Sequence, residues 1–377
     1  MAMDVLYSKY RPLIFDDIVG QEHIVRILKN SILKNKLVHS YLFSGIRGIG
    51  KTTIARIIAR YLNCQDPQEY NPCNKCYNCL AILSGSGTYT DVEEIDAASN
   101  RGVEDARKLR ERLIFKPQKG HRVIIIDEAH QLTPEASQAL LKTFEEPPDK
   151  TTFILCTTEP EQILDTIHSR CQCLNFKPVS LTNIQNHLSN IINQENWQIS
   201  NVVIHHLAVL ASGSVRDAIS QLNKISNCVD NNGVISDEDA LMLLGVVNQE
   251  YVYSYLSALA EADVASLFSI LNDIVVSGLS LNIFLRDTMV LIKDIICVKA
   301  CKGYDYVEYR AEKEKQFIGS FIKKINSLSL LNAILSLLDE SYSKILSRKN
   351  LPPDVIVVEV SMKIISKIIA HNKKGEK

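Results

Sequence analysis

Short apolar runs alternate with amphipathic segments in the first half of the chain. The runs are SYLFS (40–44), DVEEIDA (91–97), RVIIIDE (122–128) and TTFILCTT (151–158). Continuous apolar runs of this length are typical of strands that are covered on both faces. Between them lie segments with helical periodicity, such as the one in which Ile54, Ile57 and Ile58 fall on one face. The pattern predicts an α/β domain with a parallel sheet over residues 1–178.

The second half of the chain has the pattern of helices throughout. Nine of the eleven prolines fall at or before Pro178, and the next is Pro352. The residue that interrupts helices most strongly is therefore missing from a long stretch rich in Leu, Ile, Ala and Ser. We expect a small helical domain over 179–245, a second all-helical domain over 246–371, and a frayed tail at 372–377.

Charge and composition narrow the class of protein further. The net charge is −1, so any contact with DNA must come from a local basic surface. The start of the chain, MAMDVLYSKYRPLIFDD, lacks the apolar core of a signal peptide. No apolar run approaches the ~18 residues that span a bilayer. We expect a cytoplasmic protein without membrane contact, whose ten cysteines are reduced.

The segment GIRGIGKT (45–52) has the spacing of a phosphate-binding loop, G-x-x-x-x-G-K-T, between a predicted strand and a predicted helix. Its glycines let backbone N–H groups turn toward phosphates, and the helix start adds positive potential. Lys51 is expected to reach the β- and γ-phosphates of ATP, and Thr52 to ligate Mg²⁺. The residues expected to contact the nucleotide here are Gly45, Ile46, Arg47, Gly48, Ile49, Gly50, Lys51, Thr52 and Thr53.

Acidic and hydroxyl residues at the ends of two later strands suit ATP hydrolysis. Asp127 and Glu128 follow four apolar residues; the aspartate can hold Mg²⁺ through water, and the glutamate can polarise the attacking water. By itself this pair could be an ordinary strand end, but beside a phosphate loop it predicts an ATPase. Thr157 and Thr158 end the next strand and suit contact with the γ-phosphate or the water.

Two arginines complete the set of predicted catalytic residues. Arg170 in HSRCQC and Arg216 in GSVRDA lie in short polar settings beside helices. An arginine can stabilise the transition state of phosphoryl transfer, from its own chain or from a neighbouring subunit. Alone, each would be an ordinary surface or capping arginine.

Four cysteines with the spacing C-x8-C-x2-C-x2-C follow the phosphate-loop helix. They are Cys64, Cys73, Cys76 and Cys79. A reducing compartment disfavours disulfides, and a redox pair does not need four members. Four thiolates close a tetrahedral zinc site with no open position, so the spacing predicts structural Zn²⁺, with four free thiols as the alternative. The insertion is too small to fold without such a stabilising ion.

In this order the motifs closely resemble those of the gamma/tau subunit family of the bacterial DNA polymerase III clamp loader, which are AAA+ ATPases. The stretches that carry the resemblance are YRPLIFDDIVGQEHI, the phosphate loop, the four cysteines, EIDAASNRGVEDAR, IIIDEAHQLTPEASQALLKTFEEPP, SRC and GSVRDA. They cover residues 1 to about 245. The resemblance implies an AAA+ (P-loop NTPase) core with a zinc module inserted at 64–79, then a helical lid domain and an all-α collar domain that oligomerises.

The resemblance also implies a function and residue roles. ATP binding would open a sliding clamp and load it on primer–template DNA, and hydrolysis would release it, in a hetero-pentamer with delta-type and delta-prime-type subunits. By motif position, Asp127 and Glu128 are the Walker B pair and Thr158, or Thr157, is sensor 1. Arg170 would be the trans-acting arginine finger and Arg216 the sensor 2 arginine. The residues placed where the family cradles adenosine are Tyr7, Arg11, Pro12 and Val19.

The segment expected to meet DNA departs from the family pattern. Relatives often carry more basic residues where this chain has ASNRGVEDAR, which offers Arg101 and Arg107 beside Asn100 and Gly102. Backbone N–H groups at the start of a helix could substitute for side chains there. The chain has the length expected of the shorter, gamma-like form.

Three alternatives compete with an ATP-hydrolysing clamp-loader motor. A non-hydrolysing subunit of the same assembly would supply a scaffold and an arginine finger, but its relatives lose the phosphate loop, and Lys51, Thr52 and Glu128 are intact here. A zinc-dependent DNA-binding module would need a basic surface near the cysteines, and DPQEYNPCNKCYNC has a single lysine. A different AAA+ machine, such as a Holliday-junction motor, would not need the cysteine insertion.

Overall fold

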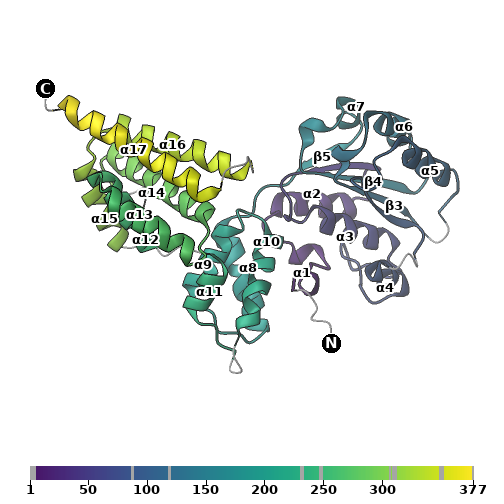
Figure 1. Cartoon of the computed structure of the whole chain (residues 1–377). Helices are drawn as coiled ribbons and strands as arrows, with labels where there is room; N and C mark the ends of the chain where they lie inside the picture. The colour runs from purple at the N-terminus through teal and green to yellow at the C-terminus, as the bar shows by residue number, and fades with distance from the viewer. Residues whose placement is uncertain are drawn as a thin grey trace. The chain divides into compact units, whose positions relative to one another are not determined.

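The chain folds into two compact units, Met1–Ile235 and Ser236–Lys377 (Figure 1). A computed structural model describes residues 6–85, 89–117, 120–229, 233–245, 249–304, 307, 312–347 and 352–375. The boundary between the units falls inside the range 179–245 that was expected to form the lid, so the expected three-domain division stays a prediction.

A five-stranded parallel sheet forms the centre of the first unit, in the order β2-β3-β4-β1-β5. The strands are β1 (Ser40–Ser44), β2 (Val92–Asp96), β3 (Arg122–Asp127), β4 (Thr151–Thr157) and β5 (Gln172–Asn175). Tyr41 and Phe43 face one hydrophobic core and Leu42 the other, so β1 is buried on both faces as its apolar run predicts. The predicted α/β domain with a parallel sheet is confirmed. Strand β5 was not predicted, because QCLN is short and mostly exposed at the sheet edge.

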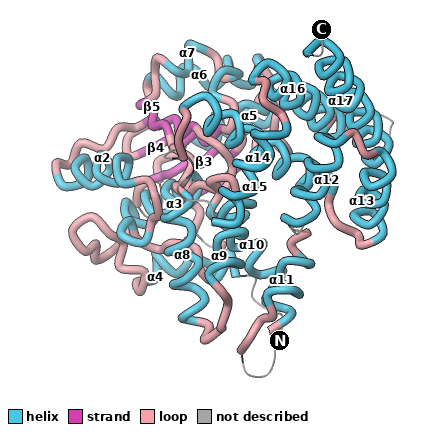
Figure 2. Tube along the Cα trace, turned by 90° about the vertical axis from the view of Figure 1, so that its left-hand side faces the viewer, coloured by secondary structure: helices cyan, strands magenta, loops and turns pink. Residues whose placement is uncertain are grey.

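Helices cover both faces of this sheet (Figures 1 and 2). On one face, apolar residues of α2 (Glu22–Leu33) and α3 (Lys51–Asn63) pack on the strands. On the other, α5 (Val103–Leu113) and α6 (Pro134–Glu145) do so. The shorter elements are α1 (Leu6–Lys9), η1 (Phe15–Asp17), α4 (Tyr77–Ser84), η2 (Ala129–Gln131), η3 (Pro160–Gln162) and α7 (Asp165–His168).

The lid part of the first unit consists of α8 (Leu181–Gln194), α9 (Asn201–Leu210), α10 (Val215–Ile225) and η4 (Ser226–Cys228). Each α-helix begins after a serine, Ser180, Ser200 or Ser214, whose hydroxyl accepts a backbone N–H of the first turn. Each of α8 and α10 buries one apolar face, which includes Ile184 and Leu188 in α8 and Ile219 and Leu222 in α10. Helix α1 is tied to α10 because Asn223 Oδ1 accepts the Leu6 N–H at 3.1 Å, which places the N-terminal segment beside the lid.

The second unit is helical in every element that the structure describes, as the proline-free stretch predicts. Its helices are α11 (Asp237–Leu243), α12 (Gln249–Glu261), α13 (Val264–Val276), α14 (Leu281–Cys301), α15 (Glu312–Lys324), α16 (Leu328–Leu346) and α17 (Pro353–Gly375). Helices α12 to α17 share one apolar core. Helix α17 runs to Gly375, into the range expected to be a frayed tail.

No single described helix combines the length and apolar content needed to cross a membrane. The pair α15 and α16 meets that test only when the two are joined, and the chain bends by 113° between them.

Candidate functional site: a nucleotide cavity and a cysteine cluster

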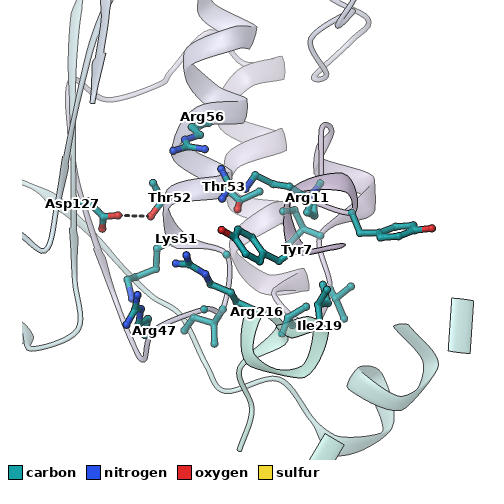
Figure 3. Close-up of a pocket in the computed structure, with 18 of the residues that line it drawn as sticks. Tyr7, Arg11, Arg47, Lys51, Thr52, Thr53, Arg56, Asp127, Arg216 and Ile219 are labelled. Carbon is teal, nitrogen blue, oxygen red and sulfur yellow. Dashed lines mark hydrogen bonds between the residues drawn. The ribbon is translucent and has the colours of Figure 1, made fainter. Parts of the chain in front are cut away.

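A cavity of about 430 Å³ lies in the first unit at the carboxyl ends of β2 and β3, where open parallel sheets place their ligands (Figure 3). The phosphate loop forms its floor, and the N-terminal segment and helices α8 and α10 form its walls. Most of the predicted nucleotide residues line it: Tyr7, Arg11, Pro12, Val19, Arg47, Gly48, Ile49, Gly50, Lys51, Thr52, Thr53, Asp127, Glu128 and Arg216. Gly45, Ile46, Thr158 and Arg170 are not among the lining residues.

The phosphate loop is shaped by glycines and touches the lid directly. Gly50 is the N-cap of α3, with φ at +103°, and no side chain caps that helix start, which leaves its N–H groups for an anion. Gly48 has φ at +78°, and a Cβ there would lie 2.2 Å from Ser214 Oγ. The carbonyl of Gly48 accepts the Arg216 N–H at 3.1 Å. The close approach of α10 therefore requires glycine at position 48.

The side chain of Lys51 is held over the phosphate loop by backbone carbonyls of that loop. Its Nζ donates to the carbonyls of Gly45 (2.6 Å) and Ile46 (2.8 Å). Burial lowers the pKa of this ammonium, and the neighbouring Glu128 and Asp127 carboxylates oppose that shift. Gly45 and Ile46 thus contribute to the site through their carbonyls. An ammonium has three donors, so one remains for a ligand in the cavity.

The two acidic residues meet Thr52 at the end of β3. Thr52 Oγ1 donates to Asp127 Oδ2 at 3.0 Å, and burial raises the pKa of Asp127. Glu128 adopts a left-handed conformation, with φ at +50°, and its N–H donates to Asp127 Oδ1 at 3.1 Å. This turn is costly for a residue with a side chain, and it brings both carboxylates to the same cavity.

The hydroxyl groups of the two candidate threonines have different partners. Thr158 Oγ1 donates to Glu128 Oε2 at 3.2 Å. Thr157 is fully buried and its Oγ1 lies 3.0 Å from His130 Nδ1 instead. Thr158 is therefore the one in contact with the acidic pair.

The two arginines lie in different surroundings. The Arg216 guanidinium carbon lies 5.0 Å from the centre of the Tyr7 ring, a cation–π distance that joins the lid to the N-terminal segment at the cavity. Arg170 follows α7, outside the cavity lining, and its Nε donates to Glu145 Oε2 at 3.1 Å. The structure does not bring Arg170 to the cavity of its own chain.

Several residues of the cavity escaped the sequence analysis. They are Tyr10, Ile18, Arg56, Glu94, Asp96, His187, Val215 and Ile219. Arg56 makes two hydrogen bonds of 2.7 Å to the Glu94 carboxylate, one turn into α3 from the loop. Burial lowers the pKa of His187. The end of the strand DVEEID could have indicated Glu94 and Asp96, because acidic residues there lie beside the end of the Asp127 strand, but nothing local marks the lid residues.

The segment proposed for DNA begins a helix as expected. Gly102 is the N-cap of α5 and carries no side-chain cap. Arg101 and Arg107 are exposed, and Arg107 pairs with Glu104 at 2.7 Å.

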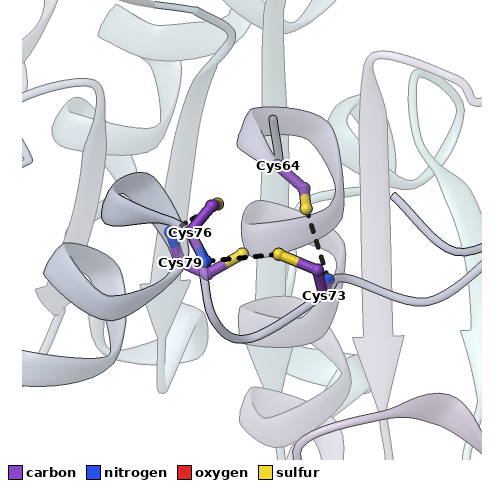
Figure 4. A group of neighbouring side chains, drawn as sticks. All are labelled: Cys64, Cys73, Cys76 and Cys79. Atoms are coloured by element: carbon purple, nitrogen blue, oxygen red, sulfur yellow. Dashed lines mark hydrogen bonds between the residues drawn. The ribbon is translucent and has the colours of Figure 1, made fainter. Parts of the chain in front are cut away.

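The four spaced cysteines converge in space (Figure 4). Their Sγ atoms all lie within 4.8 Å of one another. Cys64 is the C-cap of α3 and Cys76 the N-cap of α4, so the cluster joins these two helices. The N–H groups of Lys75 and Cys76 donate to Cys73 Sγ and lower the pKa of that thiol to about 6.

The chain matches three protein-family models along its length. Residues 20–180 match "DNA polymerase III, delta subunit", residues 183–225 "DNA polymerase III clamp loader subunit, ATPase lid domain", and residues 235–348 "DNA polymerase III subunits gamma and tau domain III".

Similar proteins include DNA polymerase III subunit tau of Bacillus subtilis, which is 38% identical over 84% of this chain and 56% of its own length. DNA polymerase III subunit tau/gamma of Haemophilus influenzae is 42% identical over 70% of this chain and 38% of its own length. Subunit tau of Escherichia coli is 36% identical over 79% of this chain and 46% of its own length. The chain thus spans about half the length of these relatives. Together with the three family matches, these similarities show that the chain belongs to the gamma/tau family of DNA polymerase III clamp loader subunits.

Proposed function

We propose that the chain is an ATP-hydrolysing motor subunit of the bacterial replicative clamp loader. ATP binding would open the sliding clamp and load it on primer–template DNA, and hydrolysis would release it. The observation that carries the proposal is that Lys51, Thr52, Asp127 and Glu128 all line one cavity. A subunit that only supplied a scaffold and an arginine finger would need no carboxylate poised there.

The cavity residues fit ATP with Mg²⁺. The Thr52 hydroxyl and the Asp127 carboxylate, 3.0 Å apart, are the hard oxygen donors that Mg²⁺ prefers. When bound, Mg²⁺ would neutralise charge on the phosphate oxygens. Lys51 and the N–H groups of the loop would hold the phosphates, while Tyr7, Arg11, Pro12 and Val19 would surround the adenosine.

Glu128 would take the role of the residue that polarises the attacking water, and Thr158, which donates to it, the role of sensor 1. Arg216 would act as the sensor 2 arginine, because it lines the cavity from the lid. Arg170 would act on a neighbouring subunit's nucleotide, which agrees with its place outside its own cavity.

The cysteine cluster fits structural zinc. A Zn–S distance of about 2.3 Å in a tetrahedral site separates the sulfurs by about 3.8 Å. Sulfurs that already lie within 4.8 Å of one another need to move by only about 1 Å to reach that geometry. Zn²⁺ bound by Cys64, Cys73, Cys76 and Cys79 would fix α4 to the end of α3.

The partners follow from the family. We propose a hetero-pentamer with delta-type and delta-prime-type subunits, in which the second unit provides the oligomerising collar. The sliding clamp and primer–template DNA would be the substrates of the assembly. Exposed Arg101 and Arg107 at the start of α5 are the candidate side chains for DNA phosphates.

The test is the ATPase rate of the chain in a complete assembly with partner subunits, a matched clamp and primed DNA. The proposal predicts that clamp and DNA together stimulate turnover more than either alone. Lys51→Ala should abolish the contribution of this subunit. Absent or unstimulated hydrolysis in an assembly that still forms would instead favour the non-hydrolysing structural subunit.

A further inference from the structure

His130 is a buried titratable residue that the proposed roles leave unused. It lies in η2, directly after the acidic pair, and its side chain is only 4% exposed. The left-handed turn at Glu128 is closed by the Gln131 N–H, which donates to the Glu128 carbonyl at 2.8 Å. This turn folds the imidazole back toward the end of β4.

The imidazole lies between two carboxylates and a threonine hydroxyl. Its Nδ1 is 3.0 Å from Thr157 Oγ1 and 3.6 Å from Glu128 Oε2. Its Nε2 is 3.7 Å from Glu159 Oε1. Thr157 Oγ1 also accepts the Glu159 N–H at 3.0 Å. The ring is thus fixed on its far side by the turn that follows β4.

Thr158 and His130 approach the same oxygen of the Glu128 carboxylate. Thr158 Oγ1 donates to Oε2, and His130 Nδ1 lies near Oε2 as well. Among the residues that the structure describes, no hydrogen-bond or ion-pair partner lies at Oε1. The carboxylate side chain is 33% exposed, so without such contacts it would sample several rotamers.

We propose that His130 is a positioning residue for hydrolysis. Together with Thr158 it holds Oε2 of Glu128, so that Oε1 is the oxygen that accepts a proton from the attacking water. A general base is effective only when it lies within hydrogen-bond reach of that proton, and supporting contacts keep it there. The inference rests on the proposed function and adds to it a residue that touches neither nucleotide nor water.

Three substitutions in the complete assembly test the proposal. His130→Ala should lower kcat by about 10- to 100-fold, because it removes the neighbour 3.6 Å from Glu128 Oε2 that helps to keep the carboxylate in place, with little change in the Kd for ATP. His130→Asn keeps an amide close to the position of Nδ1 and should restore most of kcat. His130→Gln carries its amide toward the position of Nε2 and should not.

His121 offers a matched control. It lies just before β3, and its Nε2 is 2.9 Å from Thr152 Oγ1 of β4, so it joins the same pair of strands at their other end. His121→Asn should leave kcat unchanged. A double substitution, His130→Ala with Thr158→Val, should cost less than the product of the two single effects, because both groups hold one oxygen.

The outcomes separate this inference from the function on which it rests. If Glu128→Gln abolishes turnover but His130→Ala hydrolyses ATP like the wild type, the positioning role is wrong and the motor role stands. Equal rescue by Asn and Gln, or equal losses in kcat and ATP affinity, would also overturn it. Should His130→Ala fail to fold, the comparison of kcat between His130→Asn and His130→Gln tests the positioning role instead. If Glu128→Gln turns over ATP normally, the proposed function itself fails.

Discussion

The contact between the phosphate loop and the lid should make position 48 intolerant of any side chain. Gly48 has φ at +78°, and a Cβ would lie 2.2 Å from Ser214 Oγ and 3.0 Å from Arg216 Cβ. Ser214 Oγ cannot turn away freely, because it caps α10 by accepting the Asp217 N–H at 3.2 Å. We therefore predict that Gly48→Ala pushes α10 away from the loop.

Two costs add up for this substitution. A left-handed conformation costs an alanine about 1–2 kcal/mol, and overpacking costs typically about 1–3 kcal/mol. The free protein can relieve the clash by moving the lid outward. If Arg216 contacts the bound nucleotide as proposed, the complex bears the cost. If about 2 kcal/mol remains in the complex, ATP binding weakens by about 30-fold.

Fluorescence titration with an ATP analogue measures the loss of affinity. Two further variants separate the contribution of the steric clash from that of the backbone strain. Adding Ser214→Gly to Gly48→Ala removes the nearest clash, while glycine at an N-cap costs only about a few tenths of a kcal/mol. The double variant should recover about tenfold in affinity. Gly278→Ala is the control, because Gly278 has φ at +67° and no atom lies within 4 Å of an added Cβ. This variant should show backbone strain alone, with unchanged ATP binding. Wild-type affinity in Gly48→Ala, or no recovery in the double variant, would refute the predicted contact.

Further predictions concern the cluster, the finger and the N-terminal segment. Protein purified without chelator should hold one zinc ion per chain, as metal analysis can measure. The variant Cys79→Ser should lose the zinc and have a lower Tm. The control variant Cys228→Ser, at an exposed cysteine outside the cluster, should keep both the zinc and the Tm of the wild type. Mixing Arg170→Ala subunits with wild type should impair the neighbour's site, and an effect confined to the mutant's own site would contradict the trans assignment. Lys29 and Asn71 donate to Asp16 and lower its pKa. Asp16→Asn should therefore lower the Tm at pH 7, and the difference should vanish as the pH falls through the lowered pKa; a constant difference in melting scans would contradict this.

Local spacing predicted those parts of the site that lie together in the sequence. The phosphate loop, the acidic pair and the four cysteines are each contained in one short segment, and each group is brought together as expected. Glycine and lysine spacing directly encodes the local turn, so no tertiary information was needed. The apolar runs likewise predicted four of the five strands, and only the short edge strand β5 escaped.

Contacts between distant segments could not be predicted in the same way. The approach of Arg216 to Gly48 and Tyr7 depends on how the lid packs on the core. The choice between Thr157 and Thr158 depends on which hydroxyl β4 turns toward Glu128, and the two share a strand end. The pair of Arg56 and Glu94 joins α3 to β2 across thirty-eight positions of sequence. Each of these contacts depends on tertiary packing rather than on a local pattern.

ATP hydrolysis by this subunit should depend on the Glu128 carboxylate, and a comparison of ATP binding with turnover in one variant tests that dependence. Glu128→Gln keeps the shape of the side chain and removes the carboxylate that would polarise water. In the complete assembly with clamp and primed DNA, we predict that this variant binds ATP with near wild-type affinity while its subunit's turnover falls by at least about 100-fold. Turnover at the wild-type rate, with ATP binding intact, would show that Glu128 is not the residue that polarises the attacking water.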